Sequence, residues 1–383
     1  MVNKKLKIAH LVCTFPPYRG GMGKVALEDA KEAVKYGYDV TVITPKYKYL
    51  QDLKSKEEVD GLKIHRIVPF LEVGNAAMLP WLFYRLRKYD VYHLHYPFYG
   101  VATSIFFARL LFPKKKLIIH YHMDNFAHGL KDLIFRFNRY FILPQMLKLA
   151  DKVVVHSEDY ALNCRSSWWL RRTTHKMVEI PNGVDTNFYT AKDTSKNKYN
   201  NKNKKLLFVG ALDKAHYFKG LEVLLESLKD CKQTNWQLNV IGNGDMVDHY
   251  KKLAYEYRLE DKVNFRTNCD DQCLLSYYRN SYLTILPSIT KGEAFGIVLV
   301  ESMACRTAVV ATNLPGVRSV VVEGKTGELA EPGDVESLRA KLDYLLDQPE
   351  LVEEYADYGY KRTIKKYSWE AIGRDLDKLY KTL

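Results

Sequence analysis

The chain has 383 residues, of which 47% are hydrophobic and 27% are charged, and its formal net charge is +13. This composition is that of a folded globular protein and excludes a disordered chain, and no run approaches the roughly 20 apolar residues of a membrane-spanning helix. The length exceeds that of one ordinary hydrophobic core, so we expect two domains.

The excess positive charge lies entirely in the first half of the chain. Residues 1–180 hold 29 Lys and Arg against 16 Asp and Glu, whereas residues 181–383 hold 29 of each kind. An imbalance of this kind indicates an anionic partner, either nucleic acid or an anionic membrane surface. Because the sequence carries no nucleic-acid recognition module, we expect no nucleic-acid partner.

The N-terminus and the cysteines indicate a cytoplasmic protein. The stretch MVNKKLKIAHLVCTF has only a brief apolar run behind its lysines, which predicts a first buried strand and no export signal. Six cysteines are scattered along the chain, and the close pair Cys269 and Cys273 lacks the second pair that a zinc site needs. We therefore expect all six to be reduced, structural residues.

Short β-branched runs alternate with helical stretches along the whole chain. The runs expected to be strands are 7–14, 39–44, 91–96, 116–121 and 152–157 in the first half and 205–210, 237–242, 282–288 and 308–312 in the second. Continuous apolar strands separated by helices predict parallel sheets covered on both faces. The fold class is therefore α/β, with two doubly wound, Rossmann-like domains.

The domain boundaries follow from the same pattern. Residues 190–205 are polar and rich in Lys and Asn, which predicts a connection at the surface. We assign residues 1–186 to the first domain and 187–366 to the second. Residues 367–383 form an amphipathic helix that needs a surface to cover, and we expect it to pack back on the first domain.

A glycine-rich loop follows the first predicted strand. Gly20, Gly21 and Gly23 precede a helical stretch, where glycines let backbone N–H groups approach a ligand and the helix N-terminus attracts an anion. The loop is not a P-loop, since Lys24 is followed by Val25. A plain tight turn is the alternative interpretation.

Two histidines stand at the end of the strand at 116–121. His120 and His122 are two residues apart, so their side chains point to the same side, and Asp124 follows them. A histidine at the carboxyl end of a parallel strand is placed to contact a substrate in the crevice. A structural histidine and a metal ligand are the alternatives, and the sequence shows no third ligand for a metal.

The strand at 205–210 is followed by a second basic loop. Gly210 ends the strand, and Lys214 and Lys219 precede a helix expected to begin near Gly220. A lysine beside a helix N-terminus suits a diphosphate, although a solvated loop lysine is the alternative. Another glycine turn, at Gly242 and Gly244, follows the next strand.

The stretch KGEAFGIVLVESMA, residues 291–304, carries the strongest signal. Glu293 lies in a loop before a predicted helix, and Glu301 lies inside that helix. The amides of Ala294, Phe295, Gly296 and Ile297 can hold phosphate oxygens, and carboxylates accept hydrogen bonds from vicinal hydroxyls. A ligand with a hydroxylated ring on each side of a diphosphate satisfies both glutamates. A nucleotide sugar is such a molecule.

These motifs resemble the retaining nucleotide-sugar glycosyltransferases of the GT-B fold, in the large family that includes phosphatidylinositol mannosyltransferases and bacterial sucrose and glycan synthases. The resemblance covers nearly the whole chain. The stretches that carry it are the Gly-Gly loop, HYHMD, ADKVVVHSE, IPNGVDTNFY, FVGALDKAHYFKG, IGNGD, GEAFGIVLVESMA, LPGVRSVV and GKTGELAEPGD. The resemblance implies two domains that face a cleft in which the donor binds.

The resemblance also implies roles for individual residues. Glu293 would contact donor hexose hydroxyls, Glu301 the ribose, and His122 would lie beside the transferred sugar. Lys219 would hold the diphosphate with Gly21 and the amides after Glu293. The remaining expected donor contacts are Gly20, Gly210, Lys214 and Gly242.

Two positions depart from the family pattern. Family members carry an arginine immediately after the glycine of FVG, where this chain has Ala211. Phosphate neutralisation therefore falls on Lys219, with Lys214 or His216 as further candidates. A glycine usually follows MAC, where this chain has Arg306. That turn is either strained or changed in its ligand contacts.

The function implied is retaining transfer of a hexose from GDP-mannose or a UDP-hexose to a lipid-linked or glycan acceptor. We expect no cofactor and no metal, because we identify no Asp-x-Asp metal site like that of the other major glycosyltransferase fold. A nucleotide-sugar epimerase and a non-catalytic nucleotide-sugar binding subunit are the alternatives, the latter suggested by Ala211 and Arg306.

A basic and aromatic surface predicts peripheral attachment to the inner face of the membrane. Aromatic side chains enter the headgroup region, and Lys and Arg meet anionic lipid. The residues expected at this surface are Phe135, Phe137, Trp168, Trp169, Arg171 and Arg172. The alternative is that the aromatic residues face the core of ordinary helices.

Overall fold

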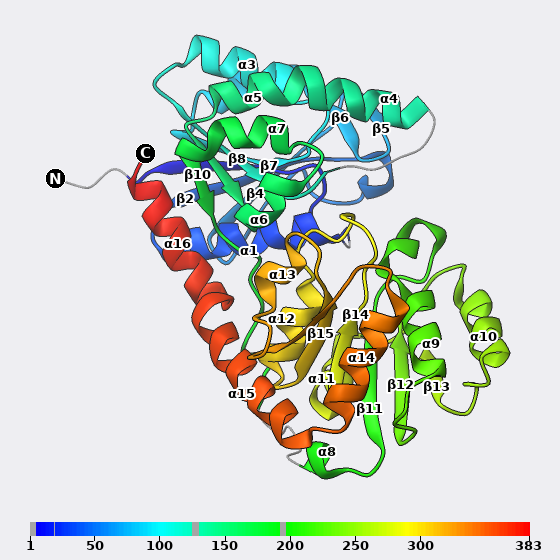
Figure 1. Cartoon of the computed structure of the whole chain (residues 1–383). Helices are drawn as coiled ribbons and strands as arrows, with labels where there is room; N and C mark the ends of the chain where they lie inside the picture. Colours follow the sequence, from blue (N-terminus) through cyan, green and yellow to red (C-terminus); the bar gives the residue numbers. More distant parts are fainter. Residues whose placement is uncertain (1–4, 19, 125–129, 192–196) are drawn as a thin grey trace. The chain divides into compact units, whose positions relative to one another are not determined.

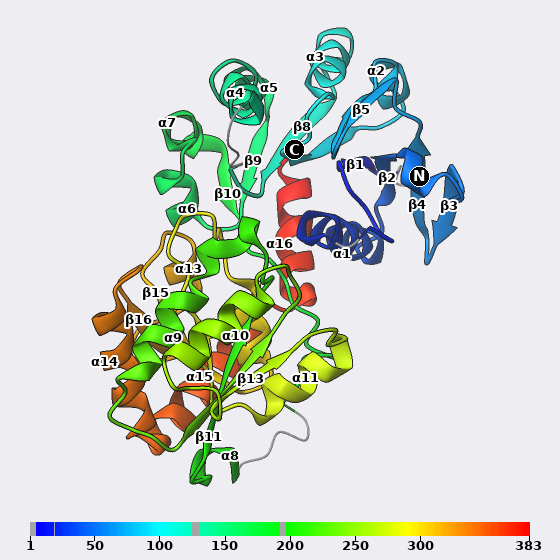
Figure 2. The same ribbon diagram turned by 90° about the vertical axis from the view of Figure 1, so that its right-hand side faces the viewer.

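The computed structural model describes residues 5–18, 20–124, 130–191 and 197–383, and the chain divides into two compact units (Figure 1). Unit 1 comprises residues 1–183 and 369–383, and unit 2 comprises residues 184–368. The boundary expected after residue 186 therefore lies three residues beyond the one in the structure. The C-terminal helix α16 (Trp369–Lys381) lies beside α1 (Gly21–Lys35) in both views (Figures 1 and 2).

Unit 1 is built on one mixed sheet in which the strands are parallel except at one edge. The strand order within the described part of the unit is β10-β9-β8-β7-β1-β2-β4-β3, and β3 and β4 run antiparallel. The strands are β1 (Lys7–Leu11), β2 (Asp39–Pro45), β3 (Lys56–Val59), β4 (Leu62–Ile67), β7 (Val91–Tyr96), β8 (Lys116–Tyr121), β9 (Lys152–Val155) and β10 (Met177–Glu179). A separate hairpin pairs β5 (Leu71–Val73) with β6 (Ala76–Met78).

Short helices connect the strands of unit 1. They are α1, η1 (Lys48–Leu50), α2 (Leu82–Leu86), α3 (Ala102–Leu111), α4 (Leu130–Phe137), η2 (Asn138–Ile142), α5 (Leu143–Leu149), α6 (Glu158–Asn163), α7 (Ser167–Leu170) and η3 (Arg171–Lys176). The segment η2 is a π-helical turn between α4 and α5. Strand β1 lies between β2 and β7, so the chain reverses its winding direction there, and this is where the crevice of a doubly wound sheet forms.

Helices α1 and α16 cover one face of the unit 1 sheet. The alanines Ala26, Ala30 and Ala33 of α1 are buried against strand residues such as Ile8 and Val154. Small residues at the helical spacing let α1 lie close to the sheet. The amphipathic α16 adds Ile372, Leu376 and Leu379 to the same core, which explains why the last helix belongs to the first unit.

Unit 2 contains a fully parallel sheet with the order β13-β12-β11-β14-β15-β16. Its strands are β11 (Lys204–Val209), β12 (Trp236–Ile241), β13 (Val263–Arg266), β14 (Leu283–Leu286), β15 (Ala308–Thr312) and β16 (Gly327–Ala330). Its helices are α8 (Asn197–Asn200), η4 (Lys214–Lys219), α9 (Leu221–Lys229), α10 (Val247–Glu256), α11 (Asp271–Asn280), α12 (Ile297–Ala304), α13 (Val317–Val320), α14 (Val335–Leu346) and α15 (Pro349–Lys366). Apolar clusters lie on both faces of the sheet, as continuous apolar strands predict.

The segment at 190–205 is not simply a surface connection between domains. Residues 192–196 lie outside the described part of the chain, but 197–205 belong to unit 2 and form α8 and the start of β11. Lys198 and Tyr199 are buried, and the Lys198 ammonium donates to the Arg306 carbonyl at 2.9 Å and to the Thr307 hydroxyl at 2.6 Å. A polar composition concealed these buried contacts.

The expectation of six reduced cysteines is also wrong. Cys269 and Cys273 form a disulfide across one turn at the start of α11, with their Cα atoms 5.4 Å apart. The other four cysteines are free. A spacing of four residues at a helix start brings two side chains together, so these two cysteines form a disulfide without the second pair that a zinc site needs.

Candidate active site

Three of the loops expected to bind the donor meet at one edge of the unit 2 sheet. Gly210 follows β11, Gly242 follows β12, and the 288–296 loop follows β14. The carboxyl ends of parallel strands share an edge, and β11 lies where the winding direction reverses. The residues predicted from separate motifs are therefore neighbours in space.

An ion pair joins two of these loops. The ammonium of Lys219 lies 2.8 Å from a carboxylate oxygen of Glu293, and the Ser288 hydroxyl donates to the same oxygen at 3.4 Å. The side chain of Lys219 is 17% exposed and that of Glu293 is 13% exposed, so the ion pair is partly shielded from solvent and a ligand can still reach it. A cation and a carboxylate this close can contact adjoining parts of one ligand, such as a phosphate and the sugar attached to it.

Glycines hold Lys219 in this position. A Cβ on Gly210 would lie 2.5 Å from Cδ of Lys219, so the absent side chain lets the lysine cross the backbone. Gly220 has φ +73° and is followed by α9, as predicted, and a Cβ there would lie 2.0 Å from the Pro287 carbonyl. The loops after β11 and β14 therefore fit together only with glycine at position 220.

Gly242 and Gly244 have a similar explanation. A Cβ on Gly242 would lie 1.8 Å from the Gly210 carbonyl oxygen, and one on Gly244 would lie 2.0 Å from the Leu212 carbonyl carbon. The close packing of two backbones is sufficient to require glycine here. Lys214 is exposed at the start of η4, where its backbone N–H donates to Asp245 at 3.2 Å.

The start of α12 offers backbone donors at the same edge. The helix begins at Ile297 after Gly296, whose φ is +82°, and no side chain caps it and no acidic residue stands in its first turn. This N-terminus is therefore electrostatically suited to an anion. Ala294 is half-buried, whereas the ring of Phe295 packs edge-on against Tyr367 in the core, so a ligand would meet only the backbone of Phe295.

Glu301 is held further along the same helix. It is buried and accepts a hydrogen bond from the Tyr278 hydroxyl at 2.9 Å. Burial, followed by the charge of Glu301, raises the pKa of Tyr278 well above its usual value. The tyrosine therefore remains a proton donor and fixes the orientation of the carboxylate.

In unit 1 the glycine-rich loop leads into α1 as predicted. Gly20 precedes the first turn in an extended conformation, and a Cβ on Gly21 would meet no atom within 4 Å. No packing contact among the described residues therefore requires a glycine at Gly21, which leaves room for a ligand. Gly23 has the opposite character, because a Cβ there would lie 2.6 Å from the Thr14 carbonyl oxygen.

His122 is part of a histidine cluster that we did not expect. His120 and His122 do lie on the same side, with ring centroids 4.4 Å apart. Neighbouring strands add four more buried imidazoles to the same face of the sheet, namely those of His10, His93, His95 and His156. In the strand register His10 is opposite His93, and His95 is opposite His120.

Hydrogen bonds connect these imidazoles in a chain in which the donor and the acceptor of each bond can be assigned. Nδ1 of His156 lies 3.3 Å from the Ile180 carbonyl, which can only accept, so this nitrogen carries the proton when the ring is neutral. Its Nε2 then accepts from Nδ1 of His122 at 2.8 Å, and Nε2 of His122 accepts from Nδ1 of His95 at 2.9 Å. Both ring nitrogens of His122 are thus occupied, and a sugar contact through either one requires a hydrogen bond to open.

The chain of hydrogen bonds continues to the C-terminal helix. Nε2 of His95 accepts from Nδ1 of His10 at 3.0 Å, and the hydroxyl of Tyr380 donates to Nε2 of His10 at 3.1 Å. The same hydroxyl accepts from Nδ1 of His93 at 2.8 Å, and Nε2 of His93 faces Nδ1 of His120 at 3.3 Å.

Burial keeps the cluster neutral. It lowers the pKa of His10 to about 3 and that of His156 to about 4, and it lowers the pKa of the other four imidazoles well below the usual value. The buried Asp29 of α1 lies 3.4 Å from Nδ1 of His120. Burial, followed by the charges of Glu28 and Glu32, raises the pKa of Asp29 well above its usual value.

The statement that His120 and His122 lack a third metal ligand is therefore wrong. Ligand atoms of His120, His122 and His156 lie within 4.8 Å of one another, and so do those of Asp29, His93, His95 and His120. Histidines recur on the same face of four neighbouring strands, and that repetition in the sequence was a usable signal. Asp124, by contrast, has a structural role, since it accepts hydrogen bonds from Tyr121, Ser166 and the Arg165 amide.

The two departures from the family pattern have different outcomes. Arg306 has φ +56°, so this turn is strained, as anticipated. It precedes β15 and therefore lies at the amino edge of the sheet, opposite Glu293, where it pairs with Asp357. The alternative expectation, that Arg306 changes a contact with the donor, is therefore wrong. Ala211, directly after Gly210, lies on the candidate-site edge.

The sequence does contain an Asp-x-Asp triplet, Asp375-Leu376-Asp377. This triplet lies in α16, where the carboxylate of Asp375 pairs with Lys378 and that of Asp377 pairs with Lys381. Asp377 also accepts from the Tyr38 hydroxyl at 2.8 Å. The triplet therefore serves to fix the helix and does not resemble a strand-end metal site.

The expected membrane surface is partly exposed. Phe137 is 54% and Trp168 is 56% exposed, whereas Phe135 and Trp169 are half-buried. The guanidinium of Arg172 lies over the Trp168 ring at 3.3 Å from its centroid, and Arg171 is exposed. Across the described ranges of the chain, none of the helices combines the length and apolar character needed to cross a bilayer.

Comparison with known proteins gives the same assignment over both halves. Residues 190–362 match the family of group 1 glycosyl transferases, and residues 19–188 match glycosyltransferase family 4. The chain is 30% identical over 333 residues to the phosphatidyl-myo-inositol mannosyltransferase of Mycobacterium tuberculosis, covering 83% of this chain and 82% of the relative. It is 24% identical over 400 residues to an uncharacterized glycosyltransferase of Methanocaldococcus jannaschii, covering 98% of each.

Solved structures share the fold over the full length. A sucrose-phosphate synthase from Thermosynechococcus elongatus superposes with a TM-score of 0.74 at 23% identity, covering 99% of each chain. Anabaena HepE in complex with UDP superposes with a TM-score of 0.73 at 17% identity, covering 99% of this chain and 100% of the other.

Proposed function

Because the chain belongs to the GT-B glycosyltransferases, we propose that it transfers a hexose from a nucleoside diphosphate sugar to its acceptor with retention of anomeric configuration. The ion pair between Lys219 and Glu293 carries the proposal. It places a cation suited to a diphosphate beside a carboxylate suited to sugar hydroxyls, at the switch point of a parallel sheet. The donor is GDP-mannose or a UDP-hexose, and the mannosyltransferase relatives favour the former.

The proposed chemistry depends on electrostatics and alignment. As the bond to the leaving diphosphate breaks, negative charge grows on the phosphate and positive charge grows on the anomeric carbon. Lys219 and the first amides of α12 stabilise the leaving group, and Glu293 orients the hexose through its hydroxyls. Glu301 binds the ribose in a direction that Tyr278 sets. The reaction then requires no metal ion at this site.

Turnover of a donor panel tests the proposal. Purified protein is incubated with GDP-mannose, UDP-glucose and ADP-glucose, each with a membrane lipid extract as acceptor, and release of the nucleoside diphosphate is followed. We expect one donor to be consumed only when acceptor is present, with the anomeric configuration kept in the product and no loss of rate in excess chelator. Consumption without acceptor that interconverts sugars would instead identify an epimerase. Binding of a donor without any turnover would identify a non-catalytic subunit.

We further propose that unit 1 meets a lipid-linked or glycan acceptor at the cytoplasmic membrane face. The exposed ring of Trp168 lies against Arg172 and close in sequence to the exposed Arg171, and Phe137 adds an exposed ring on α4, a combination suited to anionic headgroups. Co-sedimentation with anionic vesicles at low salt tests this surface. Trp168→Ala combined with Arg171→Glu and Arg172→Glu should abolish binding, and unchanged binding would exclude the surface.

A further inference from the structure

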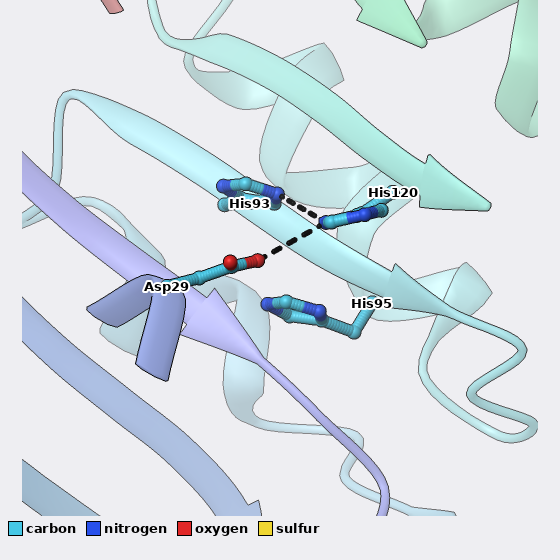
Figure 3. Close-up of side chains that lie close together, drawn as sticks. All are labelled: Asp29, His93, His95 and His120. Atoms are coloured by element: carbon cyan, nitrogen blue, oxygen red, sulfur yellow. Dashed lines mark hydrogen bonds and ion pairs between the residues drawn. The ribbon is translucent and has the colours of Figure 1, made fainter. Parts of the chain in front are cut away.

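A buried group of one carboxylate and three imidazoles lies between α1 and the sheet of unit 1. Figure 3 shows the side chains of Asp29 from α1, His93 and His95 from β7, and His120 from β8 turned toward one another. All four are buried, and each offers one ligand atom within 4.8 Å of the others. None of the four belongs to the donor site of unit 2.

Two distances in this group are those of a metal site. Nδ1 of His120 lies 3.3 Å from Nε2 of His93 and 3.4 Å from an oxygen of Asp29. Tetrahedral zinc, with bonds of about 2.0–2.1 Å to nitrogen and oxygen, holds its ligand atoms about 3.3–3.4 Å apart. Two of the separations that a tetrahedral cation requires are therefore already present, and the remaining ligand atoms lie within 4.8 Å of these.

Within the described part of the chain, three polar atoms of this group lack a hydrogen-bond partner. Both carboxylate oxygens of Asp29 and Nε2 of His120 are buried without a hydrogen-bond partner among the described residues. Asp29 is only 1% exposed, and a carboxylate buried without hydrogen bonds is strongly destabilising unless something compensates it. A bound cation is the compensation that these ligand types accept.

Hydrogen bonds from the rest of the cluster orient the ligands. Nδ1 of His93 donates to the Tyr380 hydroxyl, so the lone pair of its Nε2 faces the centre of the group. Coordination by Nδ1 of His120 places that ring's proton on Nε2. His95, whose nitrogens bond to His10 and His122, completes four ligands by giving up one of those bonds. Support of ligating imidazoles by second hydrogen bonds is the usual arrangement at metal sites.

We propose that Asp29, His93, His95 and His120 bind one first-row divalent cation, zinc foremost, as a structural metal of unit 1. Imidazole nitrogens exclude magnesium and calcium, which prefer oxygen ligands. One carboxylate with neutral imidazoles in a closed, four-ligand arrangement suits zinc. The metal joins α1 to β7 and β8, and it takes no part in the transfer reaction proposed for unit 2.

Metal analysis of the full chain tests the site. The protein is produced in zinc-supplemented medium with a tag that contains no histidine, washed briefly with chelator, and analysed by mass spectrometry for metals. We expect about one zinc per chain. After zinc is stripped, its return at 100 times the dissociation constant should raise the melting temperature of unit 1 by about 5–10 °C. Less than a tenth of an equivalent of zinc, with no thermal shift on its addition, would overturn the proposal in favour of a metal-free histidine network.

Matched variants locate the metal. Asp29→Asn and His93→Gln should each lower bound zinc at least tenfold. Glu32→Gln, at a buried acid one turn along α1 that pairs with Lys35, should leave the zinc content unchanged. Cobalt substituted into the wild type should give the intense visible bands of a tetrahedral site, a readout that does not depend on the folding of any variant. Zinc that persists in both Asp29→Asn and His93→Gln, or octahedral cobalt bands, would contradict the assignment.

Discussion

The two units share one architecture but place their polar groups in opposite ways. In unit 2 the apolar faces of the sheet are covered by apolar clusters, and the charged pair Lys219 and Glu293 stands at the carboxyl edge. In unit 1 six imidazoles and Asp29 lie inside, on a face covered by α1 and α16. A doubly wound sheet thus reverses its winding direction in both units, whereas the residues that fill its interior differ between them.

Low pH should produce the largest difference in stability between the two units. A histidine whose pKa is lowered by folding binds its proton more readily in the unfolded chain. Burial of the neutral ring therefore costs no unfolding free energy above pH 6.5, where the unfolded chain is also neutral. The unfolding free energy falls as the pH drops from 6.5 toward the pKa in the folded protein, about 4 for His156 and about 3 for His10. Each imidazole removes up to about 1.4 kcal/mol per pH unit in this window. Asp29, with its raised pKa, acts in the opposite direction but is one group against six.

The measurement is calorimetry at pH 7 and pH 5 in buffer containing chelator. Unit 1 should lose several kcal/mol of unfolding free energy, at about 2 kcal/mol for each imidazole over 1.5 pH units, and melt well before unit 2. None of the described buried residues of unit 2 is a histidine, and Trp236, the single tryptophan of that unit, reports its unfolding separately. A unit 1 transition that stays in place between the two pH values would contradict the neutral cluster.

Removing the edge carboxylate should affect activity and leave stability unchanged. Glu293→Gln is expected to lower turnover by about 10²–10³-fold, because it removes a contact to the reacting sugar. The melting temperature should stay within about 2 °C, since the residue is partly exposed and lies outside the apolar core. Glu260→Gln, an exposed acid of the same unit, is the control. Turnover above a tenth of the wild-type value would remove Glu293 from the site.

Removing the positive charge of Lys219 should weaken binding of only the diphosphate part of the ligand. Lys219→Ala is expected to weaken nucleoside diphosphate binding about 10–100-fold and to leave nucleoside binding unchanged, because only the diphosphate carries charge. Lys214→Ala, which removes an exposed lysine from the same loop, should have a smaller effect. Equal losses for both ligands, measured by titration calorimetry, would show that Lys219 does not contact phosphate.

The smallest expected effect is at the opposite edge of unit 2. Both Arg306→Gly and Arg306→Ala lose the ion pair with Asp357. Glycine tolerates the left-handed backbone conformation at this position, whereas alanine keeps its strain. The glycine variant should be more stable than the alanine variant by about 1 kcal/mol in urea unfolding. Neither should change donor affinity. An alanine variant as stable as the glycine variant would show that the turn is unstrained.

Local signals predicted the parts of the fold that depend on a few neighbouring residues. The strand ends, the start of α9 after Gly220 and the start of α12 at Ile297 follow from short glycine-containing motifs. The same-side placement of His120 and His122 follows from strand geometry alone. The convergence of Lys219 and Glu293 was implied by the family resemblance, and the shared edge of carboxyl strand ends explains it.

The interior of unit 1 could not be predicted in the same way. Asp29 and Tyr380 reach the histidines only because α1 and α16, far apart in sequence, cover the same face of the sheet. Similarly, Lys198 appeared to be a solvated residue of a polar segment, yet carbonyls from distant loops bury it and burial lowers its pKa to about 7. The residues that contact these side chains come from distant parts of the chain, so the sequence around them contains no pattern that predicts the contacts.

In the proposed donor complex, Glu301 binds the ribose, Lys219 the diphosphate and Glu293 the hexose, so each part of the nucleotide sugar has its own side chain in unit 2. Titration calorimetry of three variants, Glu301→Gln, Lys219→Ala and Glu293→Gln, against a nucleoside, its diphosphate and its diphosphate sugar tests this most directly. Glu301→Gln should weaken all three ligands equally, Lys219→Ala only the two that carry phosphate, and Glu293→Gln only the sugar nucleotide. A uniform loss in every variant, or no loss of sugar nucleotide binding in Glu293→Gln, would contradict the account.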